Sequence, residues 1–267
     1  MRLKILGERN TGTNWLERML TNAMPSVDIV HGNLPAPYQA AFRSIKLVAG
    51  ERRARPIVES LRDRAFEKHF DRTLGWKHAS ARAISDNLDR ASGEVVVVAM
   101  TKNPYSWLMS LHRRPYSVDH QEERRSASLS EFVATSWPTV GREYGPDHYQ
   151  GPVEMWADKC RSYLDLTSEM PARIVRYEDV LENPHREVAS LGESLGVTVD
   201  LTGLGERDAA KNDKGSIDDF REYYLSGEWA SELAPSDIAA INERLDHALM
   251  DRLGYDVLAV AQDRRKK

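Results

Sequence analysis

The chain has 267 residues, enough for one large α/β domain or at most two small ones, and 41% of its residues are hydrophobic. Its 37 basic residues nearly balance 41 acidic ones, for a formal net charge of −4, and no basic stripe dominates, which argues against nucleic acid as the main partner. The single cysteine, Cys160, excludes intramolecular disulfides and a metal site built on several thiolates.

The first half of the chain alternates short apolar stretches with helical patterns. A buried strand is predicted at residues 3–6, and apolar residues at helical spacing predict a helix at 13–24. The other elements expected in this half are a strand at 27–30, a polar helix at 56–70, a strand at 74–78 and a helix at 81–91.

The second half opens on the clearest strand, residues 94–100, whose continuous apolar run is typical of a parallel strand covered by helices. Asn103 as N-cap and Pro104 at the first helical position predict that a helix begins directly after it. The remaining elements expected, in chain order, are a charged loop at 113–128, helices at 129–137 and 153–170, a strand at 173–177, helices at 178–182 and 184–195, a loop-rich stretch at 200–230 and a final helix at 235–253.

Strands that alternate with helices predict an α/β fold with a mainly parallel central sheet flanked by helices. No internal repeat or low-complexity linker interrupts the chain, so we expect one domain over residues 1–267, with 258–267 as a flexible tail. The N-terminus turns polar too soon for a signal peptide, and no run of about 18 apolar residues is present. These features predict a cytoplasmic protein without a membrane span, and they indicate no particular oligomeric state.

The stretch from Gly7 to Thr13 reads G-x-x-x-x-G-T and lies between a predicted strand and a predicted helix. Backbone N–H groups in such a loop, together with the positive end of the helix dipole, form a nest for phosphate or sulfate. Thr11 and Thr13 can add hydroxyl donors, and Arg9 can add charge. The lysine that precedes the hydroxyl residue in nucleotide-hydrolysing P-loops is missing.

A second set of polar residues follows the strand at 94–100. Nucleotide kinases hold magnesium with an aspartate at the end of such a strand, but this strand ends in Thr101-Lys102. A cation therefore stands where the carboxylate belongs, and metal-dependent phosphoryl transfer is disfavoured. Ser110 shares a helix face with Asn103, so it can join Lys102 around a second anion at the carboxyl end of the sheet.

With these two motifs the chain resembles the sulfotransferases that use 3′-phosphoadenosine 5′-phosphosulfate (PAPS). The stretch Thr11-Gly12-Thr13-Asn14-Trp15 matches the family's S-G-T-T-W, and Lys102-Asn103-Pro104 with Ser110 matches its R-N-P…S motif at the same spacing. The resemblance implies a P-loop-NTPase-like sulfotransferase fold and no required metal. It also implies that Thr11, Gly12, Thr13 and Asn14 bind the 5′-phosphosulfate, that Trp15 lies near the adenine, and that Lys102 and Ser110 hold the 3′-phosphate.

Further matches run along the chain in the family's order. Arg176-Tyr177-Glu178-Asp179 resembles the strand-end Y-E-D, which brings Tyr177 into the expected cofactor site, and Gly227-Glu228-Trp229 resembles the C-terminal pattern. Lys214-Gly215 corresponds to the end of the family's R-K-G signature and is expected to bind cofactor. The main departure is Asn10, which replaces the family's loop lysine, and the neighbouring Arg9 is the cation available to stabilise the leaving group.

The resemblance also suggests a base. Family members that sulfate small alcohols carry a catalytic histidine in a K-x-H stretch, which is shortened here to Lys77-His78. A histidine suits proton abstraction from an acceptor, although the glycan-modifying branch often uses a glutamate instead. On the predicted strand at 74–78, Trp76 and His78 would share one face and Lys77 the other.

We therefore expect an enzyme that moves a sulfuryl group from PAPS to a hydroxyl or amine of a glycan or small molecule, leaving adenosine 3′,5′-bisphosphate. Two alternatives remain open at this point: a P-loop kinase-type phosphotransferase, and a nucleotide-binding protein without catalytic activity.

Overall fold

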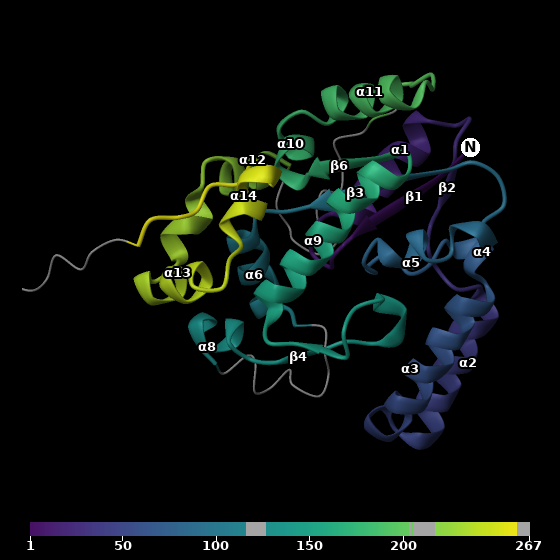
Figure 1. Ribbon diagram of the computed structural model, residues 1–267, viewed down its shortest axis with the longest axis horizontal. Coiled ribbons are helices and arrows are strands. Elements are labelled where there is room, and N and C mark those ends of the chain that lie inside the picture. The colour runs from purple at the N-terminus through teal and green to yellow at the C-terminus, as the bar shows by residue number, and fades with distance from the viewer. Residues whose placement is uncertain (116–126, 203, 205–216, 261–267) are drawn as a thin grey trace, which may run out of the picture.

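The structure is a computed structural model that describes residues 1–115, 127–202, 204 and 217–260. A central sheet of four parallel strands has the order β2-β1-β3-β6 (Figure 1). Its strands are β1 (Arg2–Gly7), β2 (Asp28–Val30), β3 (Val95–Thr101) and β6 (Ala172–Arg176). The predicted α/β fold with a parallel sheet flanked by helices is confirmed, and four of the five predicted strands are present.

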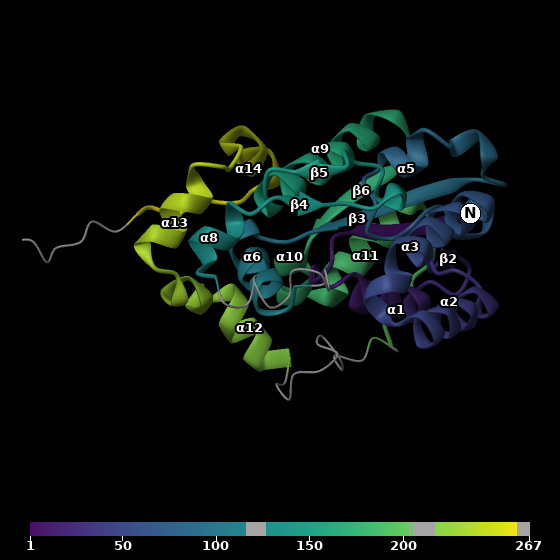
Figure 2. The same ribbon diagram turned by 90° about the horizontal axis from the view of Figure 1, so that it is seen from below.

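Helices lie on both sides of this sheet, as the two views show together (Figures 1 and 2). Leu3, Ile5 and Val98 pack in one core with α1 (Thr13–Ala23), α10 (Tyr177–Glu182) and α11 (Pro184–Leu195). Leu6 and Val97, which alternate with the first set, pack on the other face against α4 (Phe70–Thr73), α5 (Arg82–Ser85) and α9 (Pro152–Glu169). Because helices cover both faces of the sheet, the side chains on both faces of its central strands are mostly buried and apolar.

A third core joins α6 (Pro104–Arg113) to the C-terminal elements. These are α12 (Ile217–Leu225), η4 (Glu228–Glu232), α13 (Pro235–Asn242) and α14 (His247–Leu253), together with α8 (Leu129–Val133). A small antiparallel pair, β4 (Trp137–Pro138) with β5 (His148–Tyr149), borders this core, and η1 (Leu88–Arg90) and η3 (Gly141–Glu143) are single 3₁₀ turns.

Two long helices, α2 (Ala36–Ala49) and α3 (Glu51–Lys68), pack against each other and project from the sheet (Figure 1). The sequence prediction missed α2 and began α3 too late, at Pro56. That proline lies inside α3, where it removes one backbone donor without ending the helix.

Three other predicted helices have different bounds in the structure. The helix expected at 81–91 is split into α5 and η1, since the backbone of Asn87 leaves the helical region at φ −131°. The helix at 129–137 ends at Val133 because Trp137 pairs with Tyr149 in β4 and β5. The helix at 235–253 is interrupted where Asp246 accepts a hydrogen bond from the Leu249 amide and starts α14.

The strand predicted at residues 74–78 was wrong. Leu74 has φ 47° and Gly75 has φ 75°, and the Ala79 amide donates to the Trp76 carbonyl, so this stretch is a tight turn. A strand cannot continue through two successive left-handed residues. Within the described ranges, no helix is long and apolar enough to cross a membrane.

Candidate functional site

The parallel register brings the predicted site motifs to one edge of the sheet. Gly7 is opposite Met100, and Thr101 is opposite Arg176, so the segments after β1, β3 and β6 all begin at the carboxyl ends of the strands. Polar sites of open α/β sheets lie at this edge. The first loop, Lys102 and Tyr177 therefore share one region, although they are far apart in the sequence.

The loop from Gly7 to Gly12 turns directly into α1. Gly12 is the N-cap with φ 90°, and a Cβ there would lie 2.8 Å from the ring of Tyr177, so only glycine fits without strain. The amides of Gly12, Thr13 and Asn14 have no hydrogen-bond acceptor in the part of the chain that the structure describes. The loop thus presents three free N–H donors at a helix N-terminus, which suits an anion.

The threonine hydroxyl groups are less open than the sequence suggested. Thr11 and Thr13 are both buried, and the Thr11 hydroxyl donates to the Glu8 carbonyl at 2.6 Å. In this conformation Thr11 shapes the loop, and it can reach an anion only after its side chain rotates.

Lys102 is the most unusual cation of the site. It is only 3% exposed, and its Nζ lies 3.9 Å from the ring centroid of Tyr224 and 4.6 Å from that of Tyr177. No carboxylate lies within ion-pair distance of it among the residues described. A buried lysine that two aromatic faces hold, with no direct ion pair among the described residues, can receive an anion.

Ser110 and Tyr224 complete this second position. The Ser110 hydroxyl donates to the Ser106 carbonyl at 2.9 Å, and Tyr224 comes from α12 on the C-terminal side of the sheet. Burial acts to raise the pKa of Tyr224, but the charge of Lys102 and the polar side chains of Ser110 and Lys102 beside the phenol outweigh it and lower that pKa. The sequence analysis missed Tyr224, which lay in a stretch expected to be loop.

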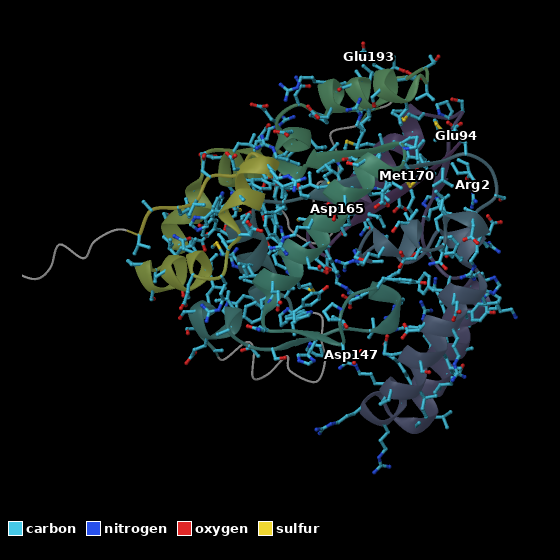
Figure 3. The ribbon with its side chains drawn as sticks, in the orientation of Figure 1. Arg2, Glu94, Asp147, Asp165, Met170 and Glu193 are labelled. Atoms are coloured by element: carbon cyan, nitrogen blue, oxygen red, sulfur yellow. The ribbon has the colours of Figure 1, made fainter. Side chains whose placement is uncertain are left out.

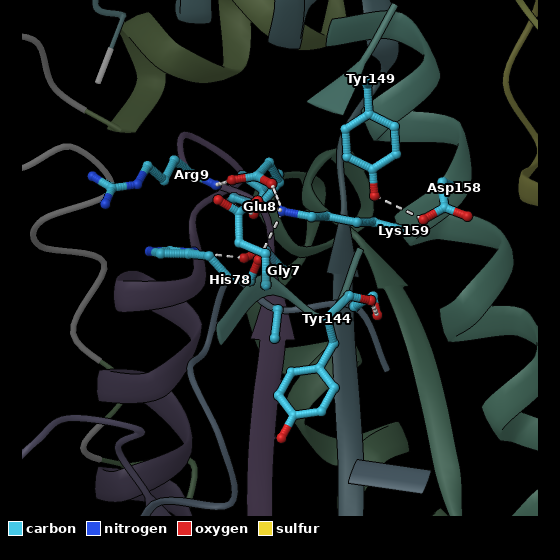
Figure 4. Close-up of polar contacts among 12 residues, drawn as sticks. Gly7, Glu8, Arg9, His78, Tyr144, Tyr149, Asp158 and Lys159 are labelled. Atoms are coloured by element: carbon cyan, nitrogen blue, oxygen red, sulfur yellow. Dashed lines mark hydrogen bonds and ion pairs between the residues drawn. The ribbon is translucent and has the colours of Figure 1, made fainter. Parts of the chain in front are cut away.

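The turn that replaces the predicted strand carries His78 to the first loop. The Gly7 amide donates to the Lys77 carbonyl at 3.0 Å, and His78 Nδ1 lies 2.7 Å from the Gly7 carbonyl (Figure 4). A carbonyl only accepts hydrogen bonds, so Nδ1 carries the proton and Nε2 is left as the basic nitrogen. Burial lowers the pKa of His78 to about 3, and the nearby Glu8 carboxylate only partly opposes this shift.

Arg9 and His78 extend to the same side of the loop (Figure 4). Both contact Trp76. The guanidinium carbon of Arg9 lies 5.3 Å from the Trp76 ring centroid, and the His78 ring meets that ring edge-on at 5.1 Å. The structure therefore brings together the two residues that the sequence analysis singled out for charge stabilisation and proton transfer.

Lys77 and Asn14 meet on the α1 side of the loop. Lys77 Nζ donates to Asn14 Oδ1 and lies 3.7 Å from a Glu17 carboxylate oxygen. Lys77 is thus tied to α1 rather than directed along the His78 side chain. Asn10 adopts φ 67°, a left-handed conformation that asparagine tolerates better than most residues.

Trp15 lies in the hydrophobic core, only 2% exposed, and makes an edge-to-face contact with Tyr177. Its indole Nε1 is buried and has no hydrogen-bond partner in the described structure. Contact with an adenine would require this region to rearrange. Lys214 and Gly215 lie outside the described residues.

A buried ion cluster that the sequence analysis missed supports the loop. Lys159 on α9 is 1% exposed and pairs with the carboxylates of Glu8 and Glu143, while also donating to the His78 carbonyl at 2.9 Å (Figure 4). Burial acts to lower the pKa of Lys159, but its two carboxylate partners outweigh that effect and raise it. Lys159 therefore joins the loop, the turn and η3 at one point. A lysine among the apolar residues of a helix face was the only sequence signal for it.

Lys4 anchors the same turn from within β1. Its buried Nζ donates to the carbonyls of Thr73 and Gly75, each at 2.6 Å, and burial lowers its pKa to about 7. Two tryptophans fix the motifs in a similar way: Trp107 Nε1 donates to the Arg9 carbonyl at 2.8 Å, and Trp156 Nε1 donates to the Lys102 carbonyl at 3.1 Å.

Comparison with known proteins supports the fold that these features suggest. No family model and no curated protein matches the sequence. Among solved structures, the sulfotransferase domain of the Synechococcus olefin synthase matches with a TM-score of 0.50 and 15% identity, over 97% of this chain and 95% of that one.

Two other sulfotransferase structures also match. The domain from the curacin biosynthetic pathway has a TM-score of 0.45 at 13% identity, over 96% of this chain and 98% of that one, and the Alicyclobacillus acidocaldarius sulfotransferase has 0.44 at 18%, over 95% and 96%. Matches at identities this low show the fold alone. The chain has the fold of the sulfotransferases.

Proposed function

We propose that this chain transfers a sulfuryl group from PAPS to a hydroxyl group, or an amine, of an acceptor molecule. The observation that carries the proposal is Lys102, a buried cation without a carboxylate partner among the described residues. It lies at the same sheet edge as a loop with three amide donors that have no acceptor in the described part of the chain. Two separate anion positions suit a nucleotide that bears phosphate groups at both ends of its ribose.

The residues present fit such a nucleotide better than a magnesium–ATP complex. Lys102 follows the central strand where a metal-holding carboxylate would be required, and the loop has Asn10 in place of the P-loop lysine. Tyr177 and Tyr224 flank Lys102 and supply aromatic faces beside the second anion position. Lys102 and Ser110 would hold the 3′-phosphate, and the amides of Gly12, Thr13 and Asn14 would hold the 5′-phosphosulfate.

In an in-line displacement at sulfur, His78 serves as the base, and Arg9 and the loop amides stabilise the leaving group. His78 Nε2 accepts the proton of the acceptor hydroxyl while its oxygen forms a bond to sulfur. As the bond from sulfur to the 5′-phosphate oxygen breaks, Arg9 and the loop amides stabilise the negative charge that develops on that oxygen. The hydrogen bond from His78 Nδ1–H to the Gly7 carbonyl keeps the proton on Nδ1 and leaves Nε2 free to accept one.

Binding and transfer test the proposal in two steps. Isothermal titration should show tight binding of adenosine 3′,5′-bisphosphate without magnesium and weaker binding of ATP with magnesium; the reverse order would instead indicate a kinase-type phosphotransferase. Incubation with radiolabelled PAPS and a panel of sugars, phenols and amines should then give a labelled product in wild type and much less in His78→Ala. Binding of the bisphosphate without transfer to any acceptor would indicate a nucleotide-binding protein without catalytic activity.

A further inference from the structure

A pocket of about 550 Å³ opens between α3 and the segment that contains η3, and Trp76 is among the residues that line it. Its volume lies within the range of small-molecule sites. The Trp76 ring is part of its lining and also contacts Arg9 and His78 directly. A molecule in the pocket would thus be one side chain away from the proposed base.

Two residues next to Trp76 and the pocket have a strained backbone. Leu74 at φ 47° and Tyr144 at φ 54° are both left-handed, although neither is a glycine or asparagine. Such conformations cost about 1–3 kcal/mol each and persist only where surrounding contacts hold them, often at functional sites. Leu74 precedes the turn that carries Trp76 and His78, and Tyr144 lines the pocket.

The polar lining is organised around Arg142. Its Nη1 donates to Asp63 at 2.7 Å, its Nη2 pairs with Glu59, and its guanidinium carbon lies 4.7 Å from the Trp76 ring centroid. Burial acts to raise the pKa of Glu59, but the charge and hydrogen bond of Arg142 outweigh it and lower that pKa, so the carboxylate is ionised at neutral pH. The aromatic wall and the two carboxylates are therefore held in fixed positions.

These carboxylates retain hydrogen-bonding capacity. An ionised carboxylate accepts about four hydrogen bonds, whereas Glu59 accepts bonds from Arg62 and Arg142, and Asp63 accepts them from Arg142 and the Gly141 amide. Glu67, also in the lining, has an exposed side chain without an ion pair in the described structure.

The lining combines three carboxylates with two guanidinium groups, from Arg64 and Arg142, and with the aromatic rings of Trp76 and Tyr144. Anions are disfavoured by this balance, and an apolar molecule would leave the remaining acceptor positions of the carboxylates unfilled. Several hydroxyl groups on a ring with an apolar face would satisfy both parts of the lining.

We propose that this pocket binds the acceptor, and that the acceptor is an uncharged sugar with one hydroxyl directed past Trp76 toward His78. This inference rests on the proposed function for the direction of transfer. The binding site itself can be tested without the transfer reaction.

Three probes of similar size separate the possible ligand classes: methyl β-D-glucopyranoside, its anionic counterpart methyl β-D-glucuronide, and cyclohexylmethanol. Saturation-transfer NMR titrations with the unliganded chain should show the neutral glycoside binding about tenfold more tightly than the other two. Glu67→Gln and Trp76→Leu should each weaken this binding about tenfold, because each removes a charged hydrogen-bond acceptor or the aromatic wall.

Glu193→Gln is the matched control, since Glu193 is an exposed carboxylate on α11, far from α3 in Figure 3. It should leave glycoside binding unchanged. Affinity for adenosine 3′,5′-bisphosphate, measured on the same samples, shows whether each variant is folded and tests the proposed function separately. Preference for the glucuronide or the cyclic alcohol, no detectable glycoside binding, or unchanged binding in both pocket variants would overturn the sugar pocket, whatever the nucleotide result.

Discussion

Replacing Lys102 by methionine tests the two-anion site most directly. Lysine and methionine have similar length and apolar stems, so the substitution removes the ammonium group and keeps much of the packing between Tyr177 and Tyr224. A hydrogen bond to a charged group contributes about 1.5–3 kcal/mol. We therefore expect adenosine 3′,5′-bisphosphate to bind Lys102→Met more weakly by about 2 kcal/mol, which is about 30-fold.

A thermodynamic cycle isolates the contact. Adenosine 5′-phosphate lacks the 3′-phosphate, so its affinity should change by less than a factor of about 3 between wild type and Lys102→Met. The difference between the two ligands, measured by isothermal titration calorimetry, gives the coupling between Lys102 and the 3′-phosphate. Lys68→Met, which changes an exposed lysine on α3, is the matched control and should leave both affinities unchanged.

The stability of the unliganded variant gives an independent check. Substitution removes a cation–π contact and also a buried charge, and these effects oppose each other, so we expect the free energy of unfolding to change by no more than about 1 kcal/mol. Equal losses of affinity for both ligands in a stable variant, or no loss for the bisphosphate, would refute the assignment of Lys102 to the 3′-phosphate.

Four further predictions concern the parts around this site. Lys159→Met should lower the free energy of unfolding, measured by urea denaturation, by about 3–5 kcal/mol at pH 7, because Glu8 and Glu143 would be buried without their cation. This loss of stability should be smaller in the double variant that also carries Glu143→Gln. A change under about 1 kcal/mol would show that the ion cluster does not support the loop. The pKa of His78 is lowered to about 3, so His78 stays unprotonated as pH falls from 8 to 5, and kcat/KM should show no His78-dependent decrease near pH 6.5; a limb near 6.5 that vanishes in His78→Ala would contradict the structure. The same shift means that unfolded chains bind more protons between pH 6.5 and 3, so His78 contributes stability above pH 6.5 that is lost as pH falls toward 3, and its replacement by glutamine should flatten acid denaturation in that window. Gly12→Ala should reduce stability by about 2 kcal/mol and weaken bisphosphate binding, since φ 90° and the Tyr177 ring exclude a Cβ; unchanged nucleotide affinity would place the phosphosulfate elsewhere.

The local elements of the sheet were largely predictable. Continuous apolar runs identify β1 and β3, and the N-cap Asn103 marks the start of α6, where its side chain accepts from the Tyr105 amide. These features depend on residues close in sequence, so local patterns carry them. Sequence patterns identify the motif residues of the loop, Lys102 and Ser110 for the same reason.

Errors arose where tertiary packing outweighs the local pattern. Residues 74–78 have the alternation of a strand, yet buried Lys4 binds the carbonyls of Thr73 and Gly75 and fixes a turn with two left-handed residues. Two amphipathic helices at α2 and α3 stabilise each other, which no pattern in either segment alone reveals.

The sequence by itself determined that a loop of the pattern G-x-x-x-x-G-T follows a buried strand, that a lysine follows the central strand, and that both belong to one α/β sheet. Only the tertiary structure decided which side chains surround them. Tyr224 reaches Lys102 from α12, and Lys159 reaches Glu8 from α9, across separations of more than a hundred residues. Contacts of that range depend on how helices pack on the sheet, because burial energy is shared by the whole core and is not encoded in any one segment.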